Sequence, residues 1–171
     1  MYYNKNLKSL LFDLRSDVNY TAWVIIDILK VFNCSNKRNS FKDYRKISFI
    51  MQFIFRDLET GIFIKFLMQE KLNVYELQII SSCYFSSKME DSTVNAAIVL
   101  LENRRVVEFN KTLKVSNIYI ISSEWVDKYP MLESIEYNLC KLLAVKDKLY
   151  ELNYDTIVRN INQLREGFAN E

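Results

Sequence analysis

The chain has 171 residues, of which half are hydrophobic and 14% are aromatic, so it carries enough apolar material to fold as one domain. It contains no histidine, which excludes Ser–His and Cys–His catalysis and histidine-ligated metals; its two glycines exclude P-loop and dinucleotide-binding loops. The formal charge of +2 combines a basic front end, residues 1–46, with a mildly acidic remainder, which favours a connector between partners.

The cysteines and the first residues indicate where the protein works. Cys34, Cys83 and Cys140 are odd in number and far apart, as expected for free thiols in a reducing compartment. Met1 is followed by polar residues, and every apolar run is far shorter than a membrane span. We therefore expect a cytoplasmic protein without a signal peptide, membrane contact, metal site, cofactor or small-molecule substrate.

Helical periodicity dominates the first half of the chain. Apolar residues repeat at helical spacing over 7–14. They repeat again in a second helix that either Asp17 or Ser16 can cap and that should run to about residue 32. Residues 33–39 are polar and predict a loop. Ser40 and Asp43 resemble a capping box, and they predict a long, nearly surrounded helix that ends near Leu58.

The middle of the chain predicts helices followed by strands. Thr60 should cap one helix, Asn73 with Glu76 should open a second through about Cys83, and a break at Ser86–Ser87 should precede a third over 90–103. The period then changes to two over 105–109 and 118–121, which predicts strands joined by the loop 110–117. This order is typical of a winged helix, with the loop as its wing.

The last part of the chain is again helical. A short helix should hold Trp125, and Pro130 suits the first position of a long helix over 130–150. A final helix should run over 155–168. The fold class predicted is mainly α: a winged-helix-like core (60–129) with one short β-hairpin, flanked by N-terminal (1–59) and C-terminal (130–171) helical regions.

Two groups of basic residues are candidate contacts for nucleic acid or an acidic partner. The wing and the end of the third helix supply one group. A stretch in which bases alternate with the aromatic residues Phe41 and Tyr44 supplies the other, an arrangement that can stack on and neutralise nucleic acid. The alternative is that both groups are solvated surface with inward-turned aromatics. The candidate residues are Lys37, Arg38, Lys42, Arg45, Lys46, Arg104, Arg105, Lys111 and Lys114.

The apolar stripe of the last helix is a candidate partner-docking surface. It lies outside the predicted winged helix, so either the N-terminal helices or another protein must cover it. Its members are Ile157, Ile161, Leu164 and Phe168. Acidic residues are present on the predicted third helix, including Glu90 and Asp91, and they disfavour its insertion into a DNA groove.

Two segments carry a resemblance to a known family. The aromatic helix 41–50 and the unit 97–108, in which a helix runs into a strand, resemble the small middle component of three-component ABC/SMC-type bacterial defence systems such as Lamassu. That component resembles a kleisin. The resemblance implies docking on the ATPase heads of an SMC-like subunit and linkage to an effector subunit, often a nuclease. One departure is that this chain lacks the long linker between two binding domains that kleisins have.

Two hypotheses of different classes follow. The first is a non-catalytic accessory subunit that binds an SMC-like ATPase and an effector nuclease in defence against phage or plasmids. The second is a winged-helix DNA-binding protein, either a transcriptional regulator or a plasmid partner. The first hypothesis also allows non-specific contact with DNA. Neither hypothesis gives the protein an enzymatic activity or a catalytic residue.

Overall fold

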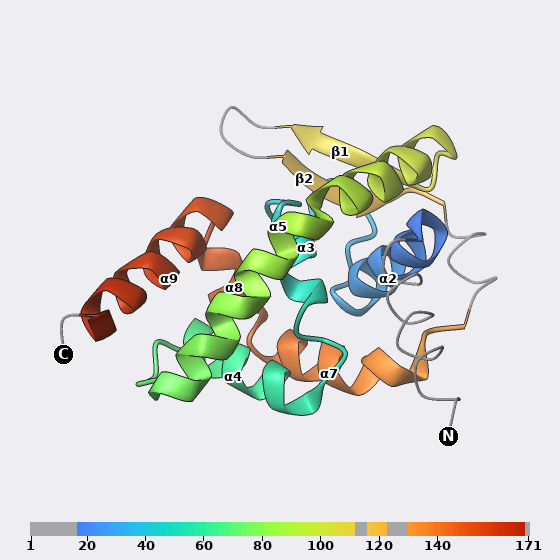
Figure 1. Cartoon of the computed structure of the whole chain (residues 1–171). Coiled ribbons are helices and arrows are strands. Elements are labelled where there is room, and N and C mark those ends of the chain that lie inside the picture. The colour runs from blue at the N-terminus through green and yellow to red at the C-terminus, as the bar shows by residue number, and fades with distance from the viewer. Residues whose placement is uncertain (1–16, 112–115, 123–129, 170–171) are drawn as a thin grey trace, which may run out of the picture.

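A computed structural model of the chain describes residues 17–111, 116–122 and 130–169 (Figure 1). It confirms the predicted class, a mainly helical fold with one two-stranded antiparallel hairpin among the described residues and with helices before and after it. In chain order the elements are α2 (Val18–Val31), α3 (Lys46–Met51), α4 (Asp57–Leu67), α5 (Val74–Asn103), β1 (Val107–Lys111), β2 (Ser116–Ile120), α7 (Glu133–Ala144), α8 (Lys146–Glu151) and α9 (Tyr154–Ala169). The helices predicted over 7–14 and around Trp125 lie outside the described residues.

Two of the predicted helix starts are confirmed by their capping bonds. The Asp17 carboxylate accepts from the backbone N–H of Asn19 at 2.7 Å and opens α2. At the start of α5, Asn73 and Glu76 form a capping box, with both reciprocal bonds at 2.9 Å. The local sequence is sufficient to predict where these helices begin, because each capping bond joins residues that are two or three positions apart.

The long helix predicted between Ser40 and Leu58 is wrong. Residues 40–45 run as an extended segment and a turn, α3 has only six residues, and α4 begins at Asp57. Asp43 does not cap a helix, because its buried carboxylate accepts bonds from the distant residue Tyr154 and from Arg45. Thr60 lies inside α4, and its hydroxyl donates to the Phe53 carbonyl at 2.8 Å.

The break predicted at Ser86–Ser87 is also wrong, since α5 is one continuous helix of 30 residues. The Ser87 side chain is fully buried, and its hydroxyl donates to the backbone carbonyl of Tyr84 at 2.7 Å. A serine that bonds back into the preceding turn is accommodated within a helix. Between Asp57 and the hairpin the chain therefore forms two helices, α4 and α5, where the sequence predicts three.

The predicted strands are present, displaced by up to two residues at their ends. Val107 pairs with Ile120 and Lys111 with Ser116. On the outer side of β2, Phe41 exchanges two backbone hydrogen bonds with Ile118, at 2.8 and 3.1 Å. The segment around Phe41 therefore extends the hairpin and joins the N-terminal half of the chain to it.

The C-terminal helices differ from the single helix predicted over 130–150. Pro130 precedes α7, whose N-cap is Leu132, and the chain changes direction at Val145 before α8. The Leu132 N–H donates to the buried Asp27 carboxylate of α2 at 3.1 Å. Packing against α2 thus decides where α7 begins. The helix predicted over 155–168 is confirmed as α9.

One contiguous core unites all three predicted regions. It contains buried residues from α2 through α9, including Ile25, Ile98 and Ile161. It includes a group of phenylalanines on α3, the following turn and α4, in which Phe53 and Phe63 stack with ring centroids 4.5 Å apart. In Figure 1, α5 crosses the front of the molecule, with α9 on one side and α2 on the other.

Three helices end in a left-handed residue that is not glycine. Asn33 after α2, Gln69 after α4 and Arg105 after α5 have φ values between 54° and 58°. After α4, the Gln69 N–H donates to the Phe66 carbonyl and the Glu70 N–H to the Lys65 carbonyl, and the same pair of bonds follows α2 and α5. These are Schellman endings, which glycine usually occupies. Here they are made without glycine.

Candidate partner-docking groove

The apolar stripe of α9 divides into a buried part and an accessible part. Ile157 and Ile161 are fully buried, so the prediction that they face a partner is corrected: they belong to the core that α9 shares with α5. Leu164 is half-buried at the edge of that core. The side chain of Phe168 lies outside the described part of the chain.

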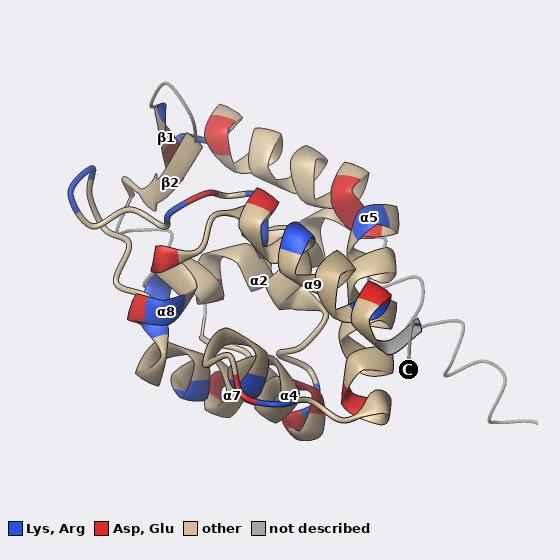
Figure 2. Ribbon diagram, turned by 90° about the vertical axis from the view of Figure 1, so that its left-hand side faces the viewer, with Lys and Arg blue, Asp and Glu red and all other residues tan. Residues whose placement is uncertain are grey.

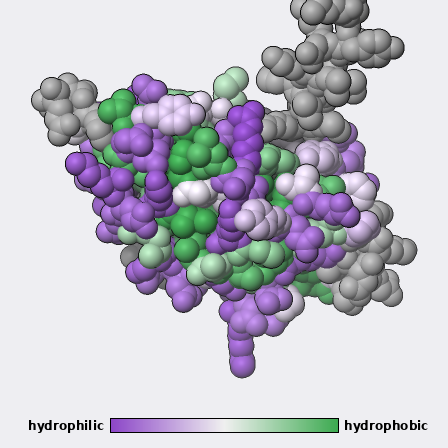
Figure 3. Space-filling view, turned by 90° about the horizontal axis from the view of Figure 1, so that it is seen from below, coloured by the Kyte–Doolittle hydropathy of each residue, from purple (hydrophilic) through white to green (hydrophobic). Residues whose placement is uncertain are grey.

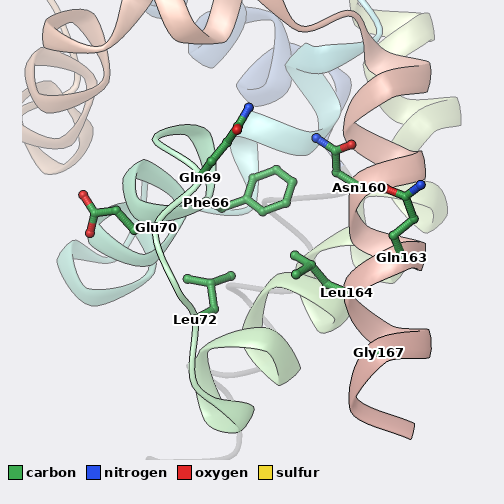
Figure 4. Close-up of a pocket in the computed structure, with 8 residues that line it drawn as sticks. All are labelled: Phe66, Gln69, Glu70, Leu72, Asn160, Gln163, Leu164 and Gly167. Atoms are coloured by element: carbon green, nitrogen blue, oxygen red, sulfur yellow. The ribbon is translucent and has the colours of Figure 1, made fainter. Parts of the chain in front are cut away.

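Leu164 opens onto a groove between α9 and the end of α4. The groove has a volume of about 500 Å³ and is drawn in Figure 4. Its apolar floor comes from α4, the loop that follows it, and α9. Its sides carry three carboxamides and one carboxylate. The lining residues are Phe66, Gln69, Glu70, Leu72, Asn160, Gln163, Leu164 and Gly167.

Secondary structure fixes both walls of the groove. The Schellman ending of α4 turns the chain at Gln69, and Leu72 then anchors the loop, being only 4% exposed. The opposite wall is α9, whose Asn160, Gln163 and Leu164 fall on one face because they are separated by three and four residues. Figure 4 shows Phe66, Leu72 and Leu164 around the same space.

The groove has the chemistry of a peptide-binding site. A carboxamide can both donate to and accept from a peptide backbone, and an apolar floor takes one or two hydrophobic side chains. Of its residues, sequence reasoning identified only Leu164. The polar residues were missed because α4 and α9 are about ninety residues apart in the sequence. No local sequence pattern predicts that these two helices lie side by side.

Two of the predicted surface cations make their polar contacts within the protein. Lys46 is fully buried, and its ammonium donates to the carbonyls of Leu149 at 2.8 Å and Leu152 at 3.0 Å. Arg45 bridges Asp43 and Asp155, with nitrogen–oxygen distances of 2.9 Å to each. Lys46 is therefore not a nucleic-acid contact, and the charge of Arg45 is already compensated.

These groups have shifted pKa values. Burial lowers the pKa of Lys46 to about 8, although the nearby Asp43 carboxylate acts in the opposite direction. Burial alone would raise the pKa of Asp43, but hydrogen bonds from Arg45 and from the Tyr154 N–H outweigh it and hold this pKa below its ordinary value. The cluster ties the segment 43–46 to the start of α9.

The Lys46 pKa predicts a dependence of stability on pH. The unfolded chain, with a lysine pKa of 10.5, binds more protons than the folded chain once the pH exceeds about 8, so this group's contribution to stability rises with pH. The difference in unfolding free energy between wild type and Lys46→Met should therefore shift in favour of wild type by about 1 kcal/mol from pH 7 to pH 9.

Urea unfolding at several pH values measures this shift. The contribution of Cys34, whose pKa is raised by burial, falls as the pH rises above its ordinary value of 9.0, but it is common to both proteins and cancels in the difference. A difference that stays constant from pH 7 to 9 would show that Lys46 titrates normally in the folded protein.

The aromatic residues between these bases point inward. Phe41 is fully buried and packs edge-on against Phe32 and Tyr150, with ring centroids 5.6 and 5.7 Å away. Tyr44 is half-buried against Phe109. The hypothesis that they stack on bases is therefore wrong for Phe41, and the alternative of inward-turned aromatics describes the structure.

The exposed bases remain on the loop beside the hairpin. Lys37, Arg38 and Lys42 are exposed, and the Asn110 amide donates to the Lys37 carbonyl at 3.4 Å, which brings the loop close to the exposed Lys111. Figure 2 shows Lys and Arg on the loop next to β1 and β2. These four residues form the basic rim. Lys114 lies outside the described residues.

The other two candidate bases do not join the basic rim. Arg104 and Arg105 end α5 at the base of the hairpin, and β1 separates them from Lys111 by six or seven residues, about 20 Å of extended chain. Both are exposed. The single wing surface predicted from the sequence is thus two separate basic positions.

The exposed apolar residues of α4 and α7 are scattered. α4 and α7 expose Leu58 and Tyr137, at 61% and 65%. Figure 3 shows the molecule from below, where these helices lie, and hydrophobic and hydrophilic residues are mixed on that face. Isolated exposed apolar residues of this kind need no partner. The groove is therefore the more specific candidate.

Among the described residues, no group of three or more Cys, Asp or Glu side chains could hold a metal ion. Over the same ranges, every helix is too short or too polar to cross a bilayer. No protein-family model matches the sequence, and neither a curated protein nor a solved structure matches it.

Proposed function

We propose that the protein is a non-catalytic accessory subunit that docks on the ATPase heads of an SMC-like protein and links them to an effector nuclease in bacterial defence. The observation that carries a docking role is the groove between α4 and α9, which combines an apolar floor with carboxamide walls. The identity of the partners rests on the resemblance of segments 41–50 and 97–108 to the middle component of ABC/SMC-type systems.

Charge also supports a connecting role. The basic rim lies at the hairpin, while the groove lies between α4 and α9 and carries Glu70 as its only charged residue. Two surfaces of different chemistry suit two different partners. An apolar segment of one partner fits the groove, and an acidic surface of the other fits the basic rim.

A substitution in the groove tests this proposal. Leu164→Asp should reduce the recovery of a co-expressed SMC-like ATPase in a pull-down by at least about tenfold, because the carboxylate must be desolvated beneath the bound segment. The matched control is Asn162→Asp, which adds the same charge on α9 at an exposed position that does not line the groove.

A second groove variant covers the case in which Leu164→Asp unfolds the protein. Gln163→Glu changes an exposed side chain on the groove wall and should also weaken recovery while preserving the circular dichroism spectrum. Equal recovery by both folded groove variants and by the control would remove the groove from the interface. A gene neighbourhood without a large ATPase would contradict the assignment of the partner.

A DNA-binding protein is the second candidate, and the basic rim favours it. Four exposed cations around the hairpin can neutralise phosphates, and such binding weakens steeply with salt. If the protein is the accessory subunit, its binding to DNA should be weak and show little sequence discrimination. The double variant Lys37→Ala/Lys111→Ala should bind DNA still more weakly. Fluorescence anisotropy at two salt concentrations measures both. Tight, site-specific binding at physiological salt would favour the regulator over the accessory subunit.

A further inference from the structure

The outward face of α5 carries an uncharged stripe with the spacing of a helix-pairing seam. Eight exposed residues follow each other at alternating intervals of three and four, the spacing that keeps side chains on one side of a helix facing a partner helix. None of the eight is charged, although charged residues make up 26% of the chain. The members of this α5 stripe are Tyr75, Gln78, Ser82, Phe85, Met89, Ser92, Ala96 and Val99.

The centre of the α5 stripe is both apolar and accessible. Met89 is 80% exposed and Phe85 is 51% exposed. The guanidinium of Arg165 on α9 lies 5.1 Å from the centroid of the Phe85 ring and borders the stripe. At the two ends, Tyr75 and Val99 are 60% and 53% exposed. Large apolar side chains are thus placed at both ends and in the middle.

The order of side chains along the stripe is self-complementary. Two copies of α5 can run antiparallel with the two-fold axis crossing them at the level of residue 87. Phe85 then faces Met89 of the other copy, and Tyr75 faces Val99. Between them Ser82 faces Ser92 and Gln78 faces Ala96, so no position of the stripe brings two large side chains of like charge together. An isologous contact requires this match of a surface with itself. A sulfur–aromatic pair is a favourable contact.

We propose that the α5 stripe is a homodimer interface, on which a second copy of this chain packs its own α5 antiparallel. The stripe is about 36 Å long at 1.5 Å per residue, and opposed helix dipoles favour the antiparallel arrangement. Charged partners gain nothing from eight uncharged positions, whereas a second copy presents the same uncharged chemistry. With four large apolar residues on each side, we expect a reversible dimer with a dissociation constant of order micromolar.

Sedimentation velocity on the purified full chain tests the dimer. Wild type should change from monomer to dimer between about 1 and 100 µM. Met89→Glu should raise the dissociation constant at least about tenfold, because it places two carboxylates at the centre of the interface. The matched control, Leu58→Glu, adds the same charge at a 61% exposed position of α4 and should leave the dimer intact. Wild type that remains monomeric throughout this range, or a Met89→Glu dimer as strong as wild type, would overturn the proposal.

Cysteine cross-linking tests the orientation. In a Cys140→Ser background, which removes the exposed native thiol, the double variant Ser82→Cys/Ser92→Cys should form a disulfide-linked dimer under mild oxidation. The two positions are about 15 Å apart within one helix, too far for a bond inside one molecule. Neither single variant should cross-link at the same rate. Single variants that cross-link as fast as the double variant would overturn the antiparallel arrangement.

Discussion

Replacing Asp43 with alanine should lower the free energy of unfolding by about 2–4 kcal/mol, because it leaves the buried backbone N–H of Tyr154 without its acceptor and removes one of the two carboxylates that hold Arg45. The side chain is only 2% exposed. It accepts from Arg45 at 2.9 and 3.0 Å and from the backbone N–H of Tyr154 at 2.8 Å. Urea unfolding followed by circular dichroism measures the loss.

Asp43→Asn is the matched comparison for this prediction. Residue 43 has a φ of 60°, a region that asparagine tolerates and alanine does not, and the amide oxygen can still accept from Tyr154. Asp43→Asn should therefore lower the free energy of unfolding clearly less than Asp43→Ala does. If alanine costs less than about 1 kcal/mol, the cluster does not hold α9 to the segment 43–46.

Phe63→Ala should cost about 3–5 kcal/mol, because it removes a whole ring from the middle of the core. Phe63 is fully buried and stacks on Phe53 at 4.5 Å, and it meets Phe49 edge-on at 5.3 Å. Few cavities of this size collapse fully, so both the transfer and the cavity contributions apply. The same unfolding experiment measures it.

Leu58→Ala provides the control on the same helix. Leu58 is 61% exposed, so its truncation should change stability by no more than about 0.5 kcal/mol. A Phe63 variant that loses as little as the Leu58 variant would mean that the phenylalanine group repacks around the missing ring. That outcome would contradict a tightly packed core at α3 and α4.

The sequence predicted the fold where the determining contacts are local. The capping bonds at Asp17 and at Asn73 with Glu76 span two or three residues, and both helix starts are where the pattern placed them. The change of period after residue 104 likewise located the hairpin. A short-range sequence pattern predicts the structure correctly when each residue bonds to a partner within the same turn of the chain.

The predictions failed where a side chain is used by a distant segment. Asp43 has the spacing of a capping residue, but its carboxylate is bonded to the backbone of Tyr154, 111 residues away. Lys46 belongs to a basic stretch that is typical of a protein surface, but its ammonium is buried and donates to the carbonyls of Leu149 and Leu152. The pair Ser86–Ser87 predicts a helix break, because the bond from Ser87 to the preceding turn is not visible in the composition.

The candidate site could be predicted only in part for the same reason. The stripe on α9 was recognisable from its period, but which of its members are buried depends on how α9 lies against α5. Ile157 and Ile161 meet α5, whereas Leu164 comes beyond the buried part and faces the end of α4. A period identifies a face of a helix, and tertiary packing decides what covers each position.

The left-handed residues that end α2, α4 and α5 have a consequence for how much change the chain can absorb. A residue with a Cβ in this conformation costs roughly 1–2 kcal/mol more than glycine, but glycine loses about 0.5–1 kcal/mol through the greater freedom of the unfolded chain, so glycine at both Gln69 and Arg105 should raise stability by about 1 kcal/mol in total. That gain is about the loss caused by one average destabilising substitution. A variant with glycine at both positions would thus remain folded with destabilising substitutions in the groove or the α5 stripe that would unfold the original sequence. More of the protein's surface could then be tested by mutation.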